Sequence, residues 1–223
     1  MNYKIALDGP SGTGKSTTAK LLAKKLNFIY IDTGAMYRAV GLYCDKNKIN
    51  IENEGEIKKH LNDIDINIFY KDGVQEISLN NEVVSKEIRQ NHISHYASVV
   101  SQYKDVREKL VSMQQKLAEE NSVIMDGRDI GTVVLPNADL KIYLVASNEV
   151  RAERRFKELI EKGQDVKKED ILKELEERDY RDTHRENSPL RKASDAIEVD
   201  NSSLTIDETV DKIYDLFKEK VGI

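Results

Sequence analysis

One short stretch of this sequence carries the residue types needed to hold a nucleotide triphosphate. The segment GPSGTGKS, residues 9–16, fits the pattern GxxxxGK[ST] and directly follows the apolar run 3–7. Its glycines let the backbone approach a phosphate chain closely and turn its amide groups inward. Lys15 would reach the β- and γ-phosphates, and the Ser16 hydroxyl would ligate Mg²⁺. The expected triphosphate contacts are Gly9, Pro10, Ser11, Gly12, Thr13, Gly14, Lys15, Ser16 and Thr17.

The alternative interpretation of this stretch is a glycine-rich turn before an ordinary helix. A strand precedes it, a helix-compatible segment follows from Ser16 to Leu26, and both the lysine and the serine are in place. The helix would also direct the positive end of its dipole at the phosphates. Because every part of the pattern is present, we predict a nucleotide site.

A second group of charged residues follows a buried strand. The run Asp126–Thr132 places two acids and an arginine between glycines, at the carboxyl end of the apolar segment 122–126. Buried charges without partners are costly, and ligands bind at this edge of a parallel sheet. A binding role for this run is therefore favoured over packing.

Three arginines share one face of a later predicted helix. Arg151, Arg154 and Arg155 stand at i, i+3 and i+4, after the apolar run 140–145. Such a cluster usually marks a solvated face. In a phosphate-binding fold it could equally be a lid that carries arginines onto a transferring phosphate, and the sequence leaves both open.

The elements that must position these residues are five βα units. Apolar runs predict buried strands, and most are followed by helix-compatible segments; the last helix begins at a capping box, Thr205 with Glu208. We predict an α/β fold, a five-stranded parallel sheet flanked by helices as in P-loop kinases. The expected strands lie within residues 3–7, 28–32, 122–126, 140–145 and 196–199.

Between these units the hydrophobic period changes. Ile64, Ile66, Ile68 and Tyr70 alternate with other residues, residues 71–73 resemble a hairpin turn, and short strands follow to Val84. We predict a small inserted antiparallel β subdomain that packs over a substrate.

The amino-acid composition limits the classes of molecule that we expect the protein to bind. The chain has 223 residues, 35 basic against 40 acidic residues for a net charge of −5, 39% hydrophobic residues and one cysteine. We expect a soluble, cytoplasmic protein that binds neither nucleic acid nor membranes and forms no internal disulfide. His92 and His95 are close together, but a surface helix explains them better than a metal site.

Several protein classes use a phosphate-binding loop of this kind. A regulatory GTPase should carry an NKxD motif, which does not occur here, and helicases or transport ATPases are larger and more basic or membrane-linked. A non-enzymatic nucleotide-sensing module remains an alternative. The further arginines near strand ends favour a small-molecule kinase, because its fold must hold a second anion opposite the triphosphate.

Four motifs then carry a family resemblance. DTGAMYR (Asp32–Arg38), ASVVSQYKDVR (Ala97–Arg107), DGRDIGT (Asp126–Thr132) and ERDYRDTHR (Glu177–Arg185) resemble the bacterial cytidylate kinases of the nucleoside monophosphate kinase family. The resemblance covers essentially the whole chain and implies transfer of the γ-phosphoryl group of ATP to CMP or dCMP, with Mg²⁺. It also implies a core (1–60, 86–148 and 186–223), an acceptor-binding subdomain (about 61–85) and a short helical lid (about 149–185), and we expect a monomer.

The resemblance also implies roles for individual residues. The cytosine readers would be Ser98, Arg107 and Asp129, and the acceptor-phosphate clamp would be Arg38, Arg128 and Arg185. Thr33, Arg178 and Asp182 would supply the remaining acceptor contacts, with Asp182 toward the sugar. Lys15, Arg128, Arg154 and Arg185 would be catalytic.

Three alternatives stay open at this point. Thr33 stands where the resemblance leads us to expect Ser, and on residue type alone it could be a helix cap beside a solvated Arg38. Asp129 could pair with Arg128 and hold the turn rather than read the base. The acceptor could also be another small molecule, such as a different nucleoside monophosphate.

Overall fold

The computed structural model describes residues 2–71, 74–161 and 163–222. The chain forms two compact units, Met1–Tyr30 with Glu120–Ile223, and Ile31–Glu119. The first is discontinuous in sequence and the second is continuous. The predicted boundaries of core, subdomain and lid stay a prediction.

The parallel sheet predicted from the apolar runs is confirmed. Its strands follow the order β2-β6-β1-β7-β8, so the strand before the phosphate-binding loop is central. Leu7 of β1 is in register with Asp126 of β6 and Ile142 of β7, which aligns the carboxyl ends of these strands. The strands are β1 (Lys4–Asp8), β2 (Ile29–Asp32), β6 (Val123–Gly127), β7 (Leu140–Val145) and β8 (Ile197–Asp200).

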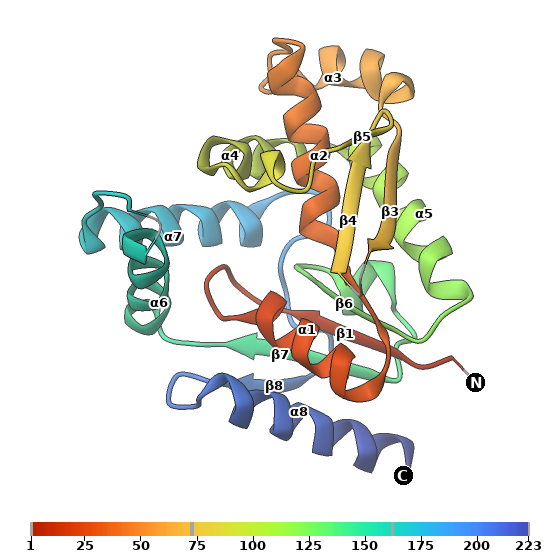
Figure 1. Ribbon diagram of the computed structural model, residues 1–223, viewed down its shortest axis with the longest axis vertical. Helices are drawn as coiled ribbons and strands as arrows, with labels where there is room; N and C mark the ends of the chain where they lie inside the picture. The colour runs from red at the N-terminus through yellow and green to blue at the C-terminus, as the bar shows by residue number, and fades with distance from the viewer. Residues whose placement is uncertain (1, 72–73, 162, 223) are drawn as a thin grey trace. The chain divides into compact units, whose positions relative to one another are not determined.

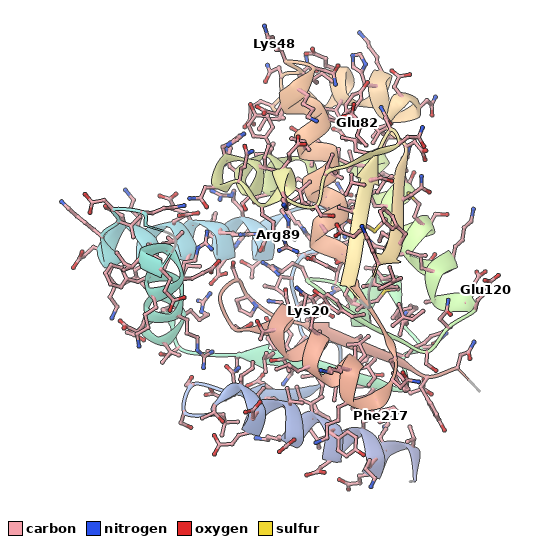
Figure 2. All side chains as sticks on the ribbon, in the orientation of Figure 1. Lys20, Lys48, Glu82, Arg89, Glu120 and Phe217 are labelled. Carbon is pink, nitrogen blue, oxygen red and sulfur yellow. The ribbon has the colours of Figure 1, made fainter. Side chains whose placement is uncertain are left out.

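Helices α1 and α8 pack together on one face of this sheet (Figure 1). Phe217 of α8, labelled in Figure 2, meets the rings of Tyr3 and Phe28 edge-on at centroid distances of 5.4 and 5.7 Å. The capping box of Thr205 and Glu208 is present as predicted. The helices of the first unit are α1 (Lys15–Leu26), the π-helical turn Ile130–Val134, α6 (Asn148–Glu161), α7 (Lys168–His184) and α8 (Ile206–Val221).

The predicted antiparallel insertion is also present, as a separate three-stranded sheet in the order β3-β4-β5. Ile66 pairs with Leu79 at one end of the hairpin and Lys71 with Val74 at the other. The predicted turn falls largely on Asp72 and Gly73, outside the described residues. The strands are β3 (Ile66–Lys71), β4 (Val74–Leu79) and β5 (Glu82–Val83).

In this second unit α2 lies between α4 and strand β4 (Figure 1). The three elements share one apolar core, to which Met36, Val100 and Ile77 contribute. The helices are α2 (Thr33–Lys46), α3 (Glu54–His60), the 3₁₀ turns Leu61–Asp63 and Glu87–Arg89, α4 (Asn91–Val100) and α5 (Lys104–Glu119).

Residues 97–107 connect two helices of this unit. They span the end of α4 and the start of α5, because the Ser101 N–H ends α4 on the carbonyl of Ala97 and the Arg107 N–H bonds the carbonyl of Tyr103. Ser98 and Arg107 therefore lie on different helices. Among the described residues, no helix is long and apolar enough to cross a membrane.

Candidate active site

The loop between β1 and α1 can be built only with glycine at its first position. Gly9 has φ +147°, and a Cβ there would lie 2.1 Å from the carbonyl oxygen of Leu144. Gly14, just before the first residue of α1, has φ 86° in the left-handed region. The loop thus packs its backbone directly on the end of β7 and opens at the N-terminus of a helix, the arrangement that binds phosphates.

Lys15 occupies this loop as a buried cation. Its side chain is folded inward, where Nζ donates to the carbonyl of Pro10 at 2.5 Å and to the Thr13 hydroxyl at 3.4 Å. Burial lowers the pKa of Lys15 well below its ordinary value and the nearby positive charge of Arg128 lowers it further, against Asp126 and Asp8. A positive charge in this setting is stabilised by an anion, which the phosphates would supply.

Ser16 meets a carboxylate that the sequence analysis did not assign to the metal. Its hydroxyl donates to Oδ2 of Asp126 at 2.7 Å, while the hydroxyl of Tyr30 donates to Oδ1 at 2.8 Å. A hydroxyl and a carboxylate are the oxygen ligands that Mg²⁺ accepts alongside phosphates and water. Within the described ranges, no group of three or more His, Cys, Asp or Glu could hold a metal by itself. The donor set therefore fits Mg²⁺ bound together with a nucleotide.

The position of Asp126 could have been found from the sequence, because it ends a strand that the apolar run predicts. The position of Tyr30 could not have been found in this way, because no local sequence pattern indicates that its hydroxyl contacts Asp126.

Asp8 holds the turn that carries the second charged group. Its two carboxylate oxygens accept from the N–H groups of Ile130 and Gly131, at 2.8 and 2.7 Å. Burial raises the pKa of Asp8 to about 6, although these two hydrogen bonds oppose the shift. The turn after Asp129 is thus tied to the end of β1, and it is a π-helical turn that the sequence did not predict.

The predicted acceptor residues of the first unit form one ion-pair group. Nε of Arg128 donates to Oδ2 of Asp182 at 2.7 Å, and Nη2 of Arg185 lies 3.5 Å from Oδ1 of Asp129. Burial raises the pKa of Asp182, but Arg128, Arg178 and Arg185 outweigh it and hold this pKa below its ordinary value. The structure therefore brings together five of the predicted residues, all of them charged: Arg128, Asp129, Arg178, Asp182 and Arg185.

The arginines of α6 are not a solvated face. Arg151 is 3% exposed, donates to the carbonyl of Ser11 at 2.9 Å and pairs with Asp179 at 2.6 Å. Arg154 donates to the carbonyl of Asn201 at 2.8 Å, with Thr13 also in reach at 3.4 Å. Two of the three side chains thus contact the phosphate-binding loop, the remaining one being Arg155.

A cavity of about 450 Å³ opens beside this loop. This volume suits a small-molecule ligand, and the position beside the loop suits the part of a nucleotide that lies beyond its phosphates. Its lining includes Gly12, Thr13, Arg154, Asn201, Leu204 and Ile206.

In the second unit Asp32 organises the start of α2. It caps the helix by accepting from the Ala35 N–H at 2.9 Å, and it pairs with Arg38 at 2.9 Å. Arg89 approaches the same carboxylate at 3.9 Å. Thr33 is the first residue of α2 and is buried, so Arg38 sits one turn into the helix as predicted.

Ser98 and Arg107 are joined through Ser101. The Ser101 hydroxyl donates to the carbonyl of Ser98 at 2.9 Å, and Arg107 Nη1 donates to the carbonyl of Ser101 at 3.0 Å. The Arg107 guanidinium also lies over the Tyr37 ring, 5.5 Å from its centroid. Within the described residues, the buried hydroxyl of Ser98 has no hydrogen-bond partner, as expected of a group that waits for a ligand.

Known proteins match the whole chain. The model of a family described as cytidylate kinase matches residues 5–219. A cytidylate kinase of Caldicellulosiruptor bescii is 54% identical over 217 residues, covering 97% of this chain and 96% of the relative. One from Leuconostoc mesenteroides is 48% identical and covers 99% of each chain.

Solved structures agree at the level of fold. A gluconokinase from Sinorhizobium meliloti has a TM-score of 0.51 at 15% identity, covering 97% of this chain and 92% of that one. An uncharacterized protein from Eubacterium ventriosum has a TM-score of 0.53 at 14% identity, covering 98% and 99%.

Proposed function

The chain belongs to the cytidylate kinase family, and we propose that it transfers the γ-phosphoryl group of ATP to CMP or dCMP, giving ADP and CDP or dCDP. One observation within the first unit carries the proposal: Ser16, at the start of α1, donates to Asp126 at 2.7 Å, and Arg128, two residues after Asp126, pairs with Asp182 at 2.7 Å. The donor loop and the Arg128–Asp182 pair are therefore close enough to interact. A phosphoryl transferase needs two anion sites at such a separation.

On the donor side, residues 9–17 would wrap the triphosphate. The cavity beside Arg154 and Asn201 would take the adenosine. Mg²⁺, held by Ser16 and Asp126 together with the phosphates, would neutralise charge on the transferring group. Lys15 would exchange its contact with the Pro10 carbonyl for the phosphate oxygens.

On the acceptor side, the proposed contacts are the residues that the family resemblance implies. Arg38, Arg128 and Arg185 would bind the phosphate, and Ser98, Arg107 and Asp129 the cytosine. Thr33, Arg178 and Asp182 would complete the set, with Asp182 toward the sugar. The unsatisfied Ser98 hydroxyl and the Arg107 guanidinium support the base-reading role.

Catalysis would rest on alignment and charge. Phosphoryl transfer passes through a loose transition state, whose equatorial oxygens carry the charge. Lys15, Arg128, Arg154 and Arg185 supply cations for it, and closure would exclude water as a competing acceptor. Arg154 would have to leave its contact with Asn201 to reach the transferring phosphate. We assign no general base.

We further propose that the protein acts as a cytoplasmic monomer without nucleic acid. Its net charge of −5 offers no general attraction to a polyanion. Light scattering at micromolar concentration would test the monomer, and the mass of a dimer would contradict it.

A panel of acceptors tests the function. The purified protein is mixed with ATP, Mg²⁺ and one of CMP, dCMP, UMP, AMP or GMP, and ADP release is measured. We expect turnover with CMP and dCMP well above the others. Faster turnover with another monophosphate would identify that molecule as the acceptor instead. Tight ATP binding without any turnover would favour a nucleotide-sensing module.

A further inference from the structure

Asn201 is a buried residue in the loop between β8 and α8, and it belongs to none of the sequence motifs described above. It is 2% exposed. Its Nδ2 donates to the carbonyl of Thr13 at 2.9 Å, and its Oδ1 accepts from Nη1 of Arg154 at 3.2 Å. Its main chain bonds Arg154 and Val145 as well. One residue thus ties the phosphate-binding loop to an arginine of α6 and to the end of β7.

The contact with Thr13 sets the direction of one peptide group. The described residues contain no cis peptide bond, and in a trans peptide the carbonyl oxygen and the following N–H point in opposite directions. Because Asn201 holds the Thr13 carbonyl, the N–H of Gly14 points away from Asn201. Amide groups turned to one side of such a loop are its phosphate donors.

The contact with Arg154 shapes the neighbouring cavity. Both side chains line it, together with Thr13. The Arg154 guanidinium bonds both the side chain and the carbonyl of Asn201, so its position on the cavity wall depends on this residue. Loss of Asn201 would disturb the loop and the wall together.

We propose that Asn201 is a positioning residue for the donor nucleotide: it orients the Thr13–Gly14 peptide toward the phosphates, and it holds Arg154 at the wall of the cavity until the phosphoryl group is transferred. The inference rests on the proposed function in naming ATP as the ligand. The contacts that support the proposal are those of Asn201 with Thr13 in the loop, with Arg154 on the cavity wall and with Val145 at the end of β7.

The test compares ligand affinities, measured separately by calorimetry. Asn201→Asp keeps an oxygen for Arg154 but replaces the donor to the buried Thr13 carbonyl with a carboxylate oxygen. We expect the dissociation constant for ATP to rise on the order of 10-fold, because the Thr13 carbonyl loses its 2.9 Å hydrogen bond and keeps only the 3.4 Å contact with Arg154, while that for CMP stays unchanged. Ser203→Asp is the matched control, since it adds the same charge at an exposed position of the same loop and should leave ATP affinity unchanged.

Asn201→Ala separates geometry from charge. It removes both side-chain hydrogen bonds without adding a carboxylate, so it should also weaken ATP and spare CMP, and it decides the question if the aspartate variant does not fold. A lower melting temperature with unchanged ATP affinity would show a structural role and overturn the proposal, as would equal weakening of ATP and CMP. Because ATP binding is measured without an acceptor, a wild type that binds ATP but phosphorylates no CMP would overturn the proposed function and leave this result readable.

Discussion

Arg128 and Asp182 form a 2.7 Å ion pair between a strand end and helix α7, and neither side chain is more than 17% exposed. Burial lowers the pKa of the arginine, but Asp182, Asp179 and Asp126 outweigh it and raise this pKa above its ordinary value. Each partner therefore keeps the other charged in the interior. Removal of either one takes away the hydrogen-bonded counter-charge of a buried group.

This pairing predicts coupled effects of substitution. Asp182→Ala should weaken CMP and leave ATP affinity nearly unchanged, and it should also lower the free energy of unfolding by about 3 kcal/mol or more. The double variant Asp182→Ala/Arg128→Ala should cost less than the sum of the two single changes. Urea denaturation of the four proteins measures the coupling, and strictly additive losses would contradict it. Equal weakening of ATP and CMP would instead make Asp182 a structural residue.

Lys15→Ala should lower kcat by about 10²-fold or more, because one preorganised charge at such a site is worth ~2.7–4 kcal/mol. Lys20→Ala is a matched control on the same helix, since Lys20 is exposed and lies over the Tyr30 ring (Figure 2). It should keep near-normal kcat. A folded Lys15 variant with the turnover of the Lys20 variant would remove Lys15 from the mechanism.

The raised pKa of Asp8 predicts that the stability of the protein depends on pH. Its folded carboxyl holds the proton up to about pH 6, against a pKa of 3.8 without the fold. Between these values the folded state binds more protons, so this group's contribution to stability is present below pH 3.8 and is lost as pH rises through 6. The loss is on the order of 3 kcal/mol, at 1.36 kcal/mol for each pH unit.

Asp8→Asn cannot titrate and should lack this fall in stability. Denaturation midpoints of both proteins at intervals from pH 4 to pH 7 give the two slopes, whatever the absolute stability of the variant. Parallel curves would mean that Asp8 is already ionised across the window.

Asp129 tests how the base is read. Cytosine offers an amino donor at position 4 and acceptors at N3 and O2, which suit a carboxylate, an arginine and a hydroxyl. Uracil would place an oxygen instead of an amino group opposite the Asp129 carboxylate. A buried polar group without a partner costs about 1–3 kcal/mol. We therefore expect at least roughly 10- to 100-fold preference for CMP over UMP in kcat/KM.

Asp129→Asn should shrink that preference, because an amide can rotate to donate to the uracil oxygen. Asp129 lies 3.5 Å from Arg185, so a role in holding the arginines is the competing explanation. It predicts lower activity on both bases with an unchanged ratio. Steady-state kinetics of both proteins on both acceptors distinguish the two.

The sequence predicted what depends on local pattern. Strand periodicity gave the parallel sheet and the inserted hairpin, and the chemistry of Thr205 with Glu208 gave the start of α8. The phosphate-binding loop could also be predicted, because the residues that define it, from Gly9 to Lys15, lie close together in the sequence.

Contacts between distant segments were not predictable in the same way. Tyr30 reaches Asp126 across 96 positions and Asn201 reaches Thr13 across 188, and neither residue type announces such a partner. The α6 arginines show the same limit, since spacing alone could not tell Arg151, buried on Ser11 and Asp179, from a solvated side chain.

The discontinuity of the first unit has a consequence for synthesis. Strand β1 pairs with β6, where Lys4 is in register with Val123, so the central strands cannot meet until more than half of the chain has left the ribosome. The segment Ile31–Glu119 is continuous and can gather its own core earlier. During translation, the phosphate-binding loop would therefore emerge first and become ordered late, and β1 would keep an unpaired edge until β6 is available.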